Sequence, residues 1–185
     1  MRLSILICTI PKRAAMFGRL QADLWGQILP YAEQIEVLVE SGIFETIGEK
    51  RNMLLKRSTG EYVCFIDDDD SISRDYVKLL MEAIESGCDC ASLKGEITID
   101  GGAPEIFEHS LKYKEWKTTN NKVKYERYQN HLNLIKSSIA KQFKYPEKNH
   151  GEDHDWSKAV HESGLLKNEY YIPSVIYYYK YISNK

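Results

Sequence analysis

The sequence predicts an α/β fold built on a mainly parallel sheet with helices on both faces. Three short apolar runs alternate with three segments whose apolar residues recur at helical spacing. Strand and helix in alternation, three times over, are the pattern of a parallel sheet covered on both faces. Because the chain has 185 residues, 43% of them hydrophobic and 28% charged, we expect one globular domain over residues 1–185.

Each of the first three strands is expected at a continuous apolar run, as in strands buried on both faces: residues 3–8, 35–39 and 62–66. Each of the three helices carries apolar side chains three or four positions apart: residues 12–26, 47–57 and 75–85. In such sheets ligands bind beyond the carboxyl ends of the strands. We therefore expect a binding site among the residues after Cys8, around Glu40 and after Ile66.

The regular alternation ends near residue 88. The second half is expected to hold strands over 90–99, an irregular connection over 112–130, a short strand over 131–135, helices over 137–143 and 151–164, and closing strands over 170–181. Loop-rich segments of this kind often carry ligand recognition.

The charges are unevenly distributed along the chain. Residues 60–108 hold 13 acidic and 3 basic side chains, whereas residues 112–148 hold 10 basic and 3 acidic ones. Two interpretations stay open: two solvated faces, or an acidic, metal-binding region opposite a basic segment that attracts an anionic ligand. The net charge of −2 argues against nucleic acid as a partner.

Cysteine usage and hydropathy favour a cytoplasmic protein. The sequence has four cysteines, which are all expected to be reduced: Cys8, Cys64, Cys88 and Cys90. Cys8 and Cys64 lie in apolar runs and are expected to be small core residues. Residues 3–7 are too short for the apolar region of a signal peptide, and no run is long enough to span a bilayer.

Four consecutive aspartates, residues 67–70, follow the third apolar run. Like charges this close repel one another unless a cation is present. Mg²⁺ and Mn²⁺ prefer carboxylate oxygens and share their coordination sphere with phosphates. Alternate residues of an extended segment project to the same side, so Asp67 and Asp69 are expected to converge on one ion. The competing interpretation is an acidic surface loop in which Asp70 or Ser71 caps the next helix.

Four segments resemble family 2 glycosyltransferases of GT-A fold. They are Gly-Glu-Lys-Arg-Asn at 48–52, Thr-Gly-Glu-Tyr-Val at 59–63, Phe-Ile-Asp-Asp-Asp-Asp at 65–70, and Gly-Glu-Asp-His-Asp-Trp at 151–156. The third is similar to the family's DxD motif, and the fourth to the Glu-Asp motif that opens a helix and supplies the catalytic base. The resemblance implies a three-layer, Rossmann-like GT-A sandwich with a mainly parallel mixed sheet.

The resemblance also implies the reaction and its partners. The donor is expected to be a nucleotide-diphosphate sugar, with a UDP-sugar as the first choice, bound together with Mn²⁺ or Mg²⁺. Its sugar is expected to be transferred with inversion to a hydroxyl of a glycan or other acceptor. Residues 1–100 are expected to bind the nucleotide-sugar, and residues 101–185 to bind the acceptor and supply the base. Contact of the acceptor-binding half with a membrane surface stays open.

The resemblance also implies roles for individual residues. Asp67 and Asp69 correspond to the metal-binding DxD pair, and Asp153 to the catalytic base. The nucleotide-sugar is expected to contact six residues: Thr9, Glu40, Lys50, Arg51, Asp67 and Asp68. Two positions depart from the family: Glu40 replaces the usual aspartate, and residues 177–179 are tyrosines where many relatives place a histidine ligand.

The helix at 151–164 supports a base at Asp153, which shares a face with Trp156 and Val160. The competing interpretation is that Glu152 and Asp153 only complement the helix dipole. Weaker candidates for acceptor contacts are Glu152, His131, His154 and Trp116; the histidines and the tryptophan are equally compatible with ordinary packing.

Two other classes of protein fit the sequence less well. A nucleotidyltransferase usually has a glycine-rich phosphate loop, but residues 9–13 contain no glycine. A nucleotide- or sugar-binding module without catalysis is disfavoured because Asp67, Asp69 and Asp153 are all retained.

Overall fold

The computed structural model describes residues 1–183, and these form two six-stranded mixed sheets. The last two residues of the expected domain, 184–185, lie outside the described part. The first sheet has the order β11-β5-β10-β3-β1-β2. Its strands are β1 (Leu3–Cys8), β2 (Ile35–Glu40), β3 (Tyr62–Phe65), β5 (Cys90–Ala91), β10 (Ile135–Lys136) and β11 (Glu169–Tyr170). β1 runs parallel to both β2 and β3, and β10 runs antiparallel to β3.

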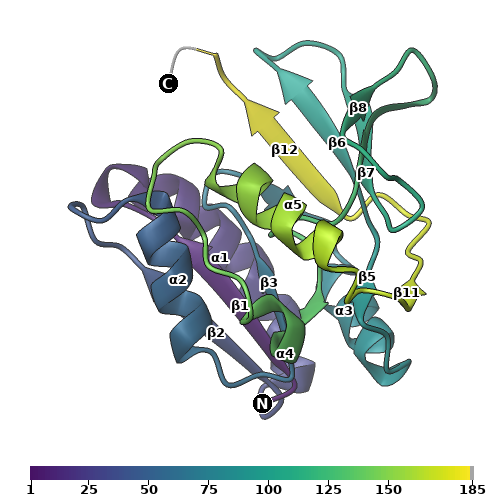
Figure 1. Cartoon of the computed structure of the whole chain (residues 1–185). Coiled ribbons are helices and arrows are strands. Elements are labelled where there is room, and N and C mark those ends of the chain that lie inside the picture. Colours follow the sequence, from purple (N-terminus) through teal and green to yellow (C-terminus); the bar gives the residue numbers. More distant parts are fainter. Residues whose placement is uncertain (184–185) are drawn as a thin grey trace.

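Helices cover both faces of the first sheet (Figure 1), so the predicted three-layer α/β arrangement is present. One face packs against α1 (Ala14–Ile28) and α3 (Tyr76–Glu85). The other packs against α2 (Ile47–Arg57), α4 (Ser137–Ala140) and α5 (Glu152–Ser163). Short 3-10 turns, Pro11–Arg13 and Leu29–Tyr31, flank α1.

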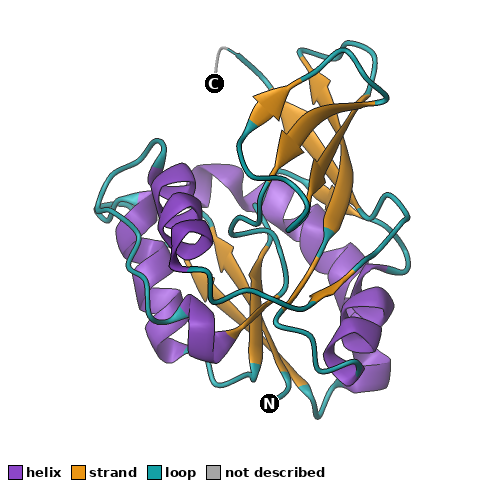
Figure 2. Cartoon of the chain, turned by 45° about the vertical axis from the view of Figure 1, so that its right-hand side comes forward, coloured by secondary structure: helices purple, strands orange, loops and turns teal. Residues whose placement is uncertain are grey.

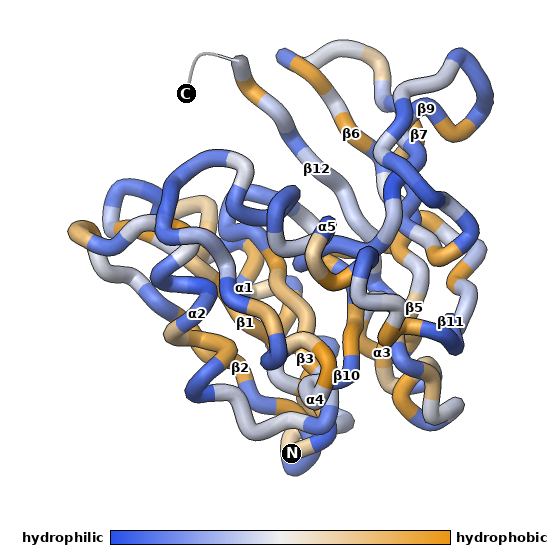
Figure 3. Tube along the Cα trace, in the orientation of Figure 1, coloured by the Kyte–Doolittle hydropathy of each residue, from blue (hydrophilic) through white to orange (hydrophobic). Residues whose placement is uncertain are grey.

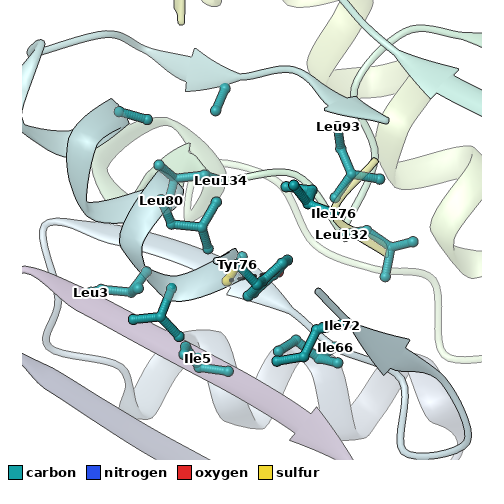
Figure 4. Close-up of a cluster of buried hydrophobic side chains, with 14 of the residues drawn as sticks. Leu3, Ile5, Ile66, Ile72, Tyr76, Leu80, Leu93, Leu132, Leu134 and Ile176 are labelled. Carbon is teal, nitrogen blue, oxygen red and sulfur yellow. Dashed lines mark hydrogen bonds between the residues drawn. The ribbon is translucent and has the colours of Figure 1, made fainter. Parts of the chain in front are cut away.

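Strand β1 holds the layers together because both of its faces are buried. Leu3 and Ile5 face the core beside Tyr76 and Leu80 of α3 (Figure 4), while Leu6 belongs to the core on the opposite face. Burial of each such aliphatic side chain contributes about 1.5–3 kcal/mol. The continuous apolar run is therefore the expected composition of this central strand.

Local sequence sets the ends of the two helices that lead to the site. Thr46 and Glu49 form a reciprocal capping box at the start of α2. Gly48 lies against the chain that precedes α5, since a Cβ there would be 1.8 Å from the Pro146 carbonyl oxygen. Gly151 begins α5 with φ 75° and Gly164 ends it with φ 66°, conformations that favour glycine. Asp153 is thereby held in the first turn of α5.

The second sheet stands beside the helix-flanked first sheet (Figure 2) and has the order β4-β12-β6-β7-β9-β8. Its strands are β4 (Ser71–Ile72), β6 (Leu93–Ile99), β7 (Glu105–His109), β8 (Lys117–Thr118), β9 (Val123–Arg127) and β12 (Tyr177–Tyr181). Figure 3 shows β1 coloured as hydrophobic along most of its length and β12 as more hydrophilic. The contrast follows from position, because the residues of β12 become progressively exposed toward its end.

Several element predictions need correction. The irregular connection expected over 112–130 contains β8 and β9. Both residues of β8 are exposed and those of β9 are only partly buried, so neither strand has an apolar run that would reveal it. The strand expected over 131–135 is reduced to β10, although the His131 carbonyl still accepts a hydrogen bond from the Phe65 amide at 2.9 Å. The helix cap expected at Asp70 or Ser71 is wrong: α3 begins after Asp75, and Ser71 belongs to β4.

The structure agrees with the expectation that the cysteines are reduced. All four cysteines are buried free thiols. None of the helices within residues 1–183 combines the length and apolar character that crossing a bilayer requires.

Candidate active site

The carboxyl ends of β1 and β3 are joined through Asp68. The Thr9 hydroxyl donates to Asp68 Oδ2 at 2.7 Å, and Arg13 Nη1 donates to Asp68 Oδ1 at 2.8 Å. The Asp68 side chain is almost fully buried. Asp68 therefore fixes the loop after β1 against the acidic run, and both of its oxygens are occupied by protein donors.

Lys50 and Glu40 stabilise the same edge of the sheet. The Lys50 ammonium is buried and donates to the Thr9 carbonyl at 2.9 Å, tying α2 to the end of β1. Glu40, at the end of β2, accepts from Arg57 at 3.1 Å and from the Gly42 amide at 3.4 Å. The structure thus gathers four of the six predicted donor-binding positions at one edge, with Lys50 directed at the backbone: Thr9, Glu40, Lys50 and Asp68.

Arg51 lies between two carboxylates. Its Nη2 is 3.2 Å from Asp67 Oδ1, and its Nε is 3.3 Å from Glu152 Oε1. The guanidinium also lies 4.9 Å from the centre of the Phe65 ring. Burial opposes its charge, but Asp67 and the surrounding anionic groups keep the pKa of Arg51 above its ordinary value. Its buried Nη1 has no hydrogen-bond partner among residues 1–183.

His131 lies between the first aspartate of the acidic run and the predicted base. Its Nε2 is 3.4 Å from Asp67 Oδ2, and its Nδ1 is 3.7 Å from Asp153 Oδ2. The imidazole is buried, whereas the side chains of Asp67 and Asp153 are each 29% exposed. Burial opposes the charge of Asp67, but His131 and Arg51 hold its pKa well below its usual range.

The other two aspartates have different surroundings. Asp69 is 13% exposed and lies 3.6 Å from Arg13 Nη1. Asp70 accepts from the Tyr177 hydroxyl at 2.9 Å and from the Lys180 amide at 3.2 Å. Burial, together with the charges of Asp67 and Asp69, raises the pKa of Asp70 well above its ordinary value. Asp70 therefore holds a proton more readily than an ordinary carboxyl group.

The carboxylates of this site suit a divalent cation only when a bound ligand supplies further oxygen atoms to the ion. Within the described part of the chain, no group of three or more histidine, cysteine or carboxylate side chains is placed to hold a metal by itself. Asp67 and Asp69 supply one or two carboxylates, and Mg²⁺ is commonly bound in that way with phosphate oxygens and water completing its sphere. The residues fit a cation that arrives with a diphosphate.

A pocket of about 400 Å³ opens beside Asp67 and Asp153. Its other walls come from the second sheet and from residues 130–132, and they are largely aromatic: Ile97, Ile99, Phe107, His109, Trp116, Tyr125, Arg127, Asn130, His131, Leu132, Tyr179 and Tyr181. Of the four weaker acceptor candidates, His131 and Trp116 line the pocket. His154 makes an edge-to-face contact with Trp116, with the ring centres 4.8 Å apart, and Glu152 is buried against Arg51.

Several residues of this region were missed by the sequence analysis. Arg13 follows β1, where the carboxyl-end rule could have indicated it. Tyr177 accepts from the Asp67 amide at 3.1 Å and donates to Asp70, and it occupies the stretch that differs from the family at 177–179. Arg127 and His109 come from β9 and β7 and carried no recognisable signal, because both strands were unforeseen.

A three-layer α/β core with acidic residues at the carboxyl edge of its parallel strands is the architecture of nucleotide-binding transferases of GT-A fold. Residues 24–146 match the model of the family described as glycosyl transferase family 2. The chain belongs to this family. No curated protein matches the sequence significantly.

Solved structures of S. aureus TarS share the fold. TarS 1–349 in complex with UDP-GlcNAc superposes with a TM-score of 0.70 and 18% sequence identity, covering 100% of this chain and 60% of that one. TarS itself gives a TM-score of 0.68 and 18% identity, covering 97% of this chain and 37% of that one. The chain thus has the GT-A fold and spans about three fifths or less of the length of these neighbours.

Proposed function

We propose that the chain transfers a sugar from a UDP-sugar to an acceptor hydroxyl, with Asp153 as the base. The observation that carries the proposal is the placement of Asp67 and Asp153 on opposite sides of His131, both lining one pocket. In the family resemblance these are the donor-binding and the base positions, so the reaction centre would lie between them. The TarS complex with UDP-GlcNAc supports a UDP-sugar donor.

In the proposed reaction Asp153 takes the proton of the acceptor hydroxyl as that oxygen bonds to the anomeric carbon of the sugar. The bond from this carbon to the diphosphate breaks, and UDP leaves with the electron pair. A single displacement inverts the configuration at that carbon. A positioned carboxylate base accelerates such a step by about 10²–10⁴ fold.

Charge on the departing diphosphate requires cations. Arg51 supplies a permanent positive charge beside this region, since its Nη2 lies 3.2 Å from Asp67 Oδ1. A Mn²⁺ or Mg²⁺ ion held by Asp67 and Asp69 would neutralise charge on the leaving oxygen. Thr9, Lys50, Asp68 and Arg13 would keep the loop after β1 in place, as their mutual contacts indicate.

The division of labour follows the order of the chain. Donor-binding positions lie within residues 1–100, whereas most of the pocket wall and Asp153 lie within 101–185. Trp116 and His131 are proposed to contact the acceptor, and His154 to support Trp116 from behind. Glu152 is proposed to act through Arg51, not on the acceptor.

The donor site is tested by thermal unfolding with UDP, GDP, ADP and CDP, each with and without Mn²⁺. A ligand at 100 times its Kd stabilises the folded state by about 2.7 kcal/mol. We expect a Mn²⁺-dependent increase in Tm with UDP that is lost in Asp69→Asn and kept in Asp75→Asn, an exposed residue of the following turn. No shift with any nucleotide would refute the proposal.

A further inference from the structure

The pocket beside Asp153 contains a cation without an anionic partner. Arg127 lines the pocket, and no carboxylate within residues 1–183 lies within 4.0 Å of its guanidinium. Two nearby lysines do have carboxylate partners: Lys112, in the turn after β7, lies 2.7 Å from Glu108, and Lys124 of β9 forms an ion pair with Glu105. Arg127 Nη1 donates instead to the carbonyls of Lys117 and Glu126, at 2.6 and 2.8 Å. Burial lowers the pKa of Arg127 because it disfavours the charged form of the guanidinium. An anion beside the guanidinium would compensate its positive charge.

Two aromatic rings flank this cation. The Arg127 guanidinium lies 5.2 Å from the centre of Trp116 and 5.5 Å from that of Tyr125. Trp116 also meets His154 at the start of α5, next in sequence to Asp153. Trp116 therefore bridges the space between the arginine and the helix that carries the base.

Two polar ring nitrogens also belong to residues that line the pocket. Trp116 Nε1 is buried without a partner in the described chain, and so is His131 Nδ1, which lies 3.7 Å from Asp153. An indole N–H is only a donor, so its partner must be an acceptor oxygen. Flat aromatic walls with polar groups at their edges suit a ring that has apolar C–H faces and hydroxyl oxygens at its edges.

We infer that this pocket binds an acceptor sugar bearing an oxyanion, with its ring on Trp116 and the oxyanion, a carboxylate or a phosphate, at Arg127. The inference rests on the proposed function and narrows its acceptor class. The negative charges of Asp67 and Asp153 would repel an oxyanion at their side of the pocket. The reacting hydroxyl is thereby directed to Asp153 and the charged substituent to Arg127. This assignment also gives a role to one cation of the basic segment 112–148.

Binding of three matched sugars, measured by titration calorimetry at low ionic strength without donor, tests the inference. The probes are methyl glucoside, methyl glucuronide and glucose 6-phosphate, which share the pyranose ring and differ in charge. We expect at least one charged sugar to bind about tenfold or more tightly than the neutral one, since one charge-assisted pair at a partly buried site is worth that factor. The two charged arms distinguish carboxylate from phosphate.

Variants locate the effect. Arg127→Gln is expected to remove the preference for the charged sugar, and Arg127→Lys to keep part of it. Trp116→Phe, which keeps a ring face but lacks the N–H, is expected to weaken the binding of all three sugars. Lys122→Gln, an exposed residue of the same segment, is the control and should retain the preference.

Equal binding of neutral and charged sugars, no binding of any of them, or a preference that survives Arg127→Gln would overturn the inference. The Mn²⁺-dependent UDP shift is measured on the same preparations and also reports that each variant is folded. If UDP binds while the charged sugars do not, this inference fails and the proposed function stands. If UDP does not bind, the proposed function itself fails.

Discussion

His131 Nδ1 lies 3.7 Å from Asp153 Oδ2, and the opposite nitrogen of the same ring lies 3.4 Å from Asp67 Oδ2. The two contacts connect residues that are 86 positions apart in the sequence, the first aspartate of the acidic run and the acid in the first turn of α5. A buried imidazole between two half-exposed carboxylates sets where each can point. His131 therefore positions both the proposed base and the first aspartate of the proposed donor site.

Replacement of the base should abolish turnover without affecting donor binding. In Asp153→Asn we expect UDP release from a UDP-sugar to fall by about 10²–10⁴ fold, because the amide cannot accept the proton. The Mn²⁺-dependent Tm shift with UDP should remain. Asp155→Asn is the matched control: it lies in the same turn, is exposed and pairs with Lys148 at 2.6 Å. Equal loss in both variants would show that Asp153 has no special role.

Loss of Arg51 should destabilise the fold, because Glu152 would be left buried without its cation. Removal of one partner of a buried ion pair costs about 3–5 kcal/mol. Arg51→Met is therefore expected to lower the free energy of unfolding by that amount. Arg57→Met, on the same helix but 51% exposed, should cost less than about 1 kcal/mol. The free energies come from urea unfolding, and similar values for the two variants would contradict the account.

The Tyr177 hydroxyl should be needed to shape the acidic loop. Tyr177→Phe removes the acceptor for the Asp67 amide and the donor to Asp70, and leaving a buried polar group unsatisfied costs about 1–3 kcal/mol. We expect lower stability and weaker Mn²⁺-dependent UDP binding. Tyr178→Phe, whose side chain points to the other face of β12, serves for comparison. Unchanged UDP affinity in Tyr177→Phe would separate this tyrosine from the site.

His109 should make stability depend on pH in the acidic range. Burial lowers its pKa from 6.5 to about 3, so between these values the unfolded chain binds a proton that the folded one does not. The contribution of His109 to the free energy of unfolding is fully present above pH 6.5. It falls as the pH decreases, by at most about 1.4 kcal/mol per pH unit. His109→Gln should flatten the curve of Tm against pH in that window. The exposed His150→Gln is the control, and parallel curves for His109→Gln and wild type would disprove the effect.

The first half of the fold was predictable because its signals are local. The residues of β1 form an apolar run that is buried on both faces, and those of α2 match the expected helix at both ends. The second sheet was only partly predictable. β7, β8 and β9 are short and polar, and they owe their existence to pairing with distant strands, such as Phe107 with Tyr125.

The same distinction applies to the site. The acidic run follows β3 directly, so the edge at which it lies could be inferred from chain order. The partners of its aspartates could not, because Arg13, His131 and Tyr177 reach them from separate elements. Glu152 illustrates this: its sequence position suggested the acceptor, and tertiary packing places it against Arg51.

The measurement that tests the central claim most directly is NMR analysis of products formed from UDP-GlcNAc and Mn²⁺ with water as the acceptor. The account predicts UDP and free GlcNAc that appears first as the β-anomer, with no reaction in Asp153→Asn. Formation of UMP and sugar phosphate, or of an initial α-anomer, would contradict direct inverting transfer with Asp153 as the base.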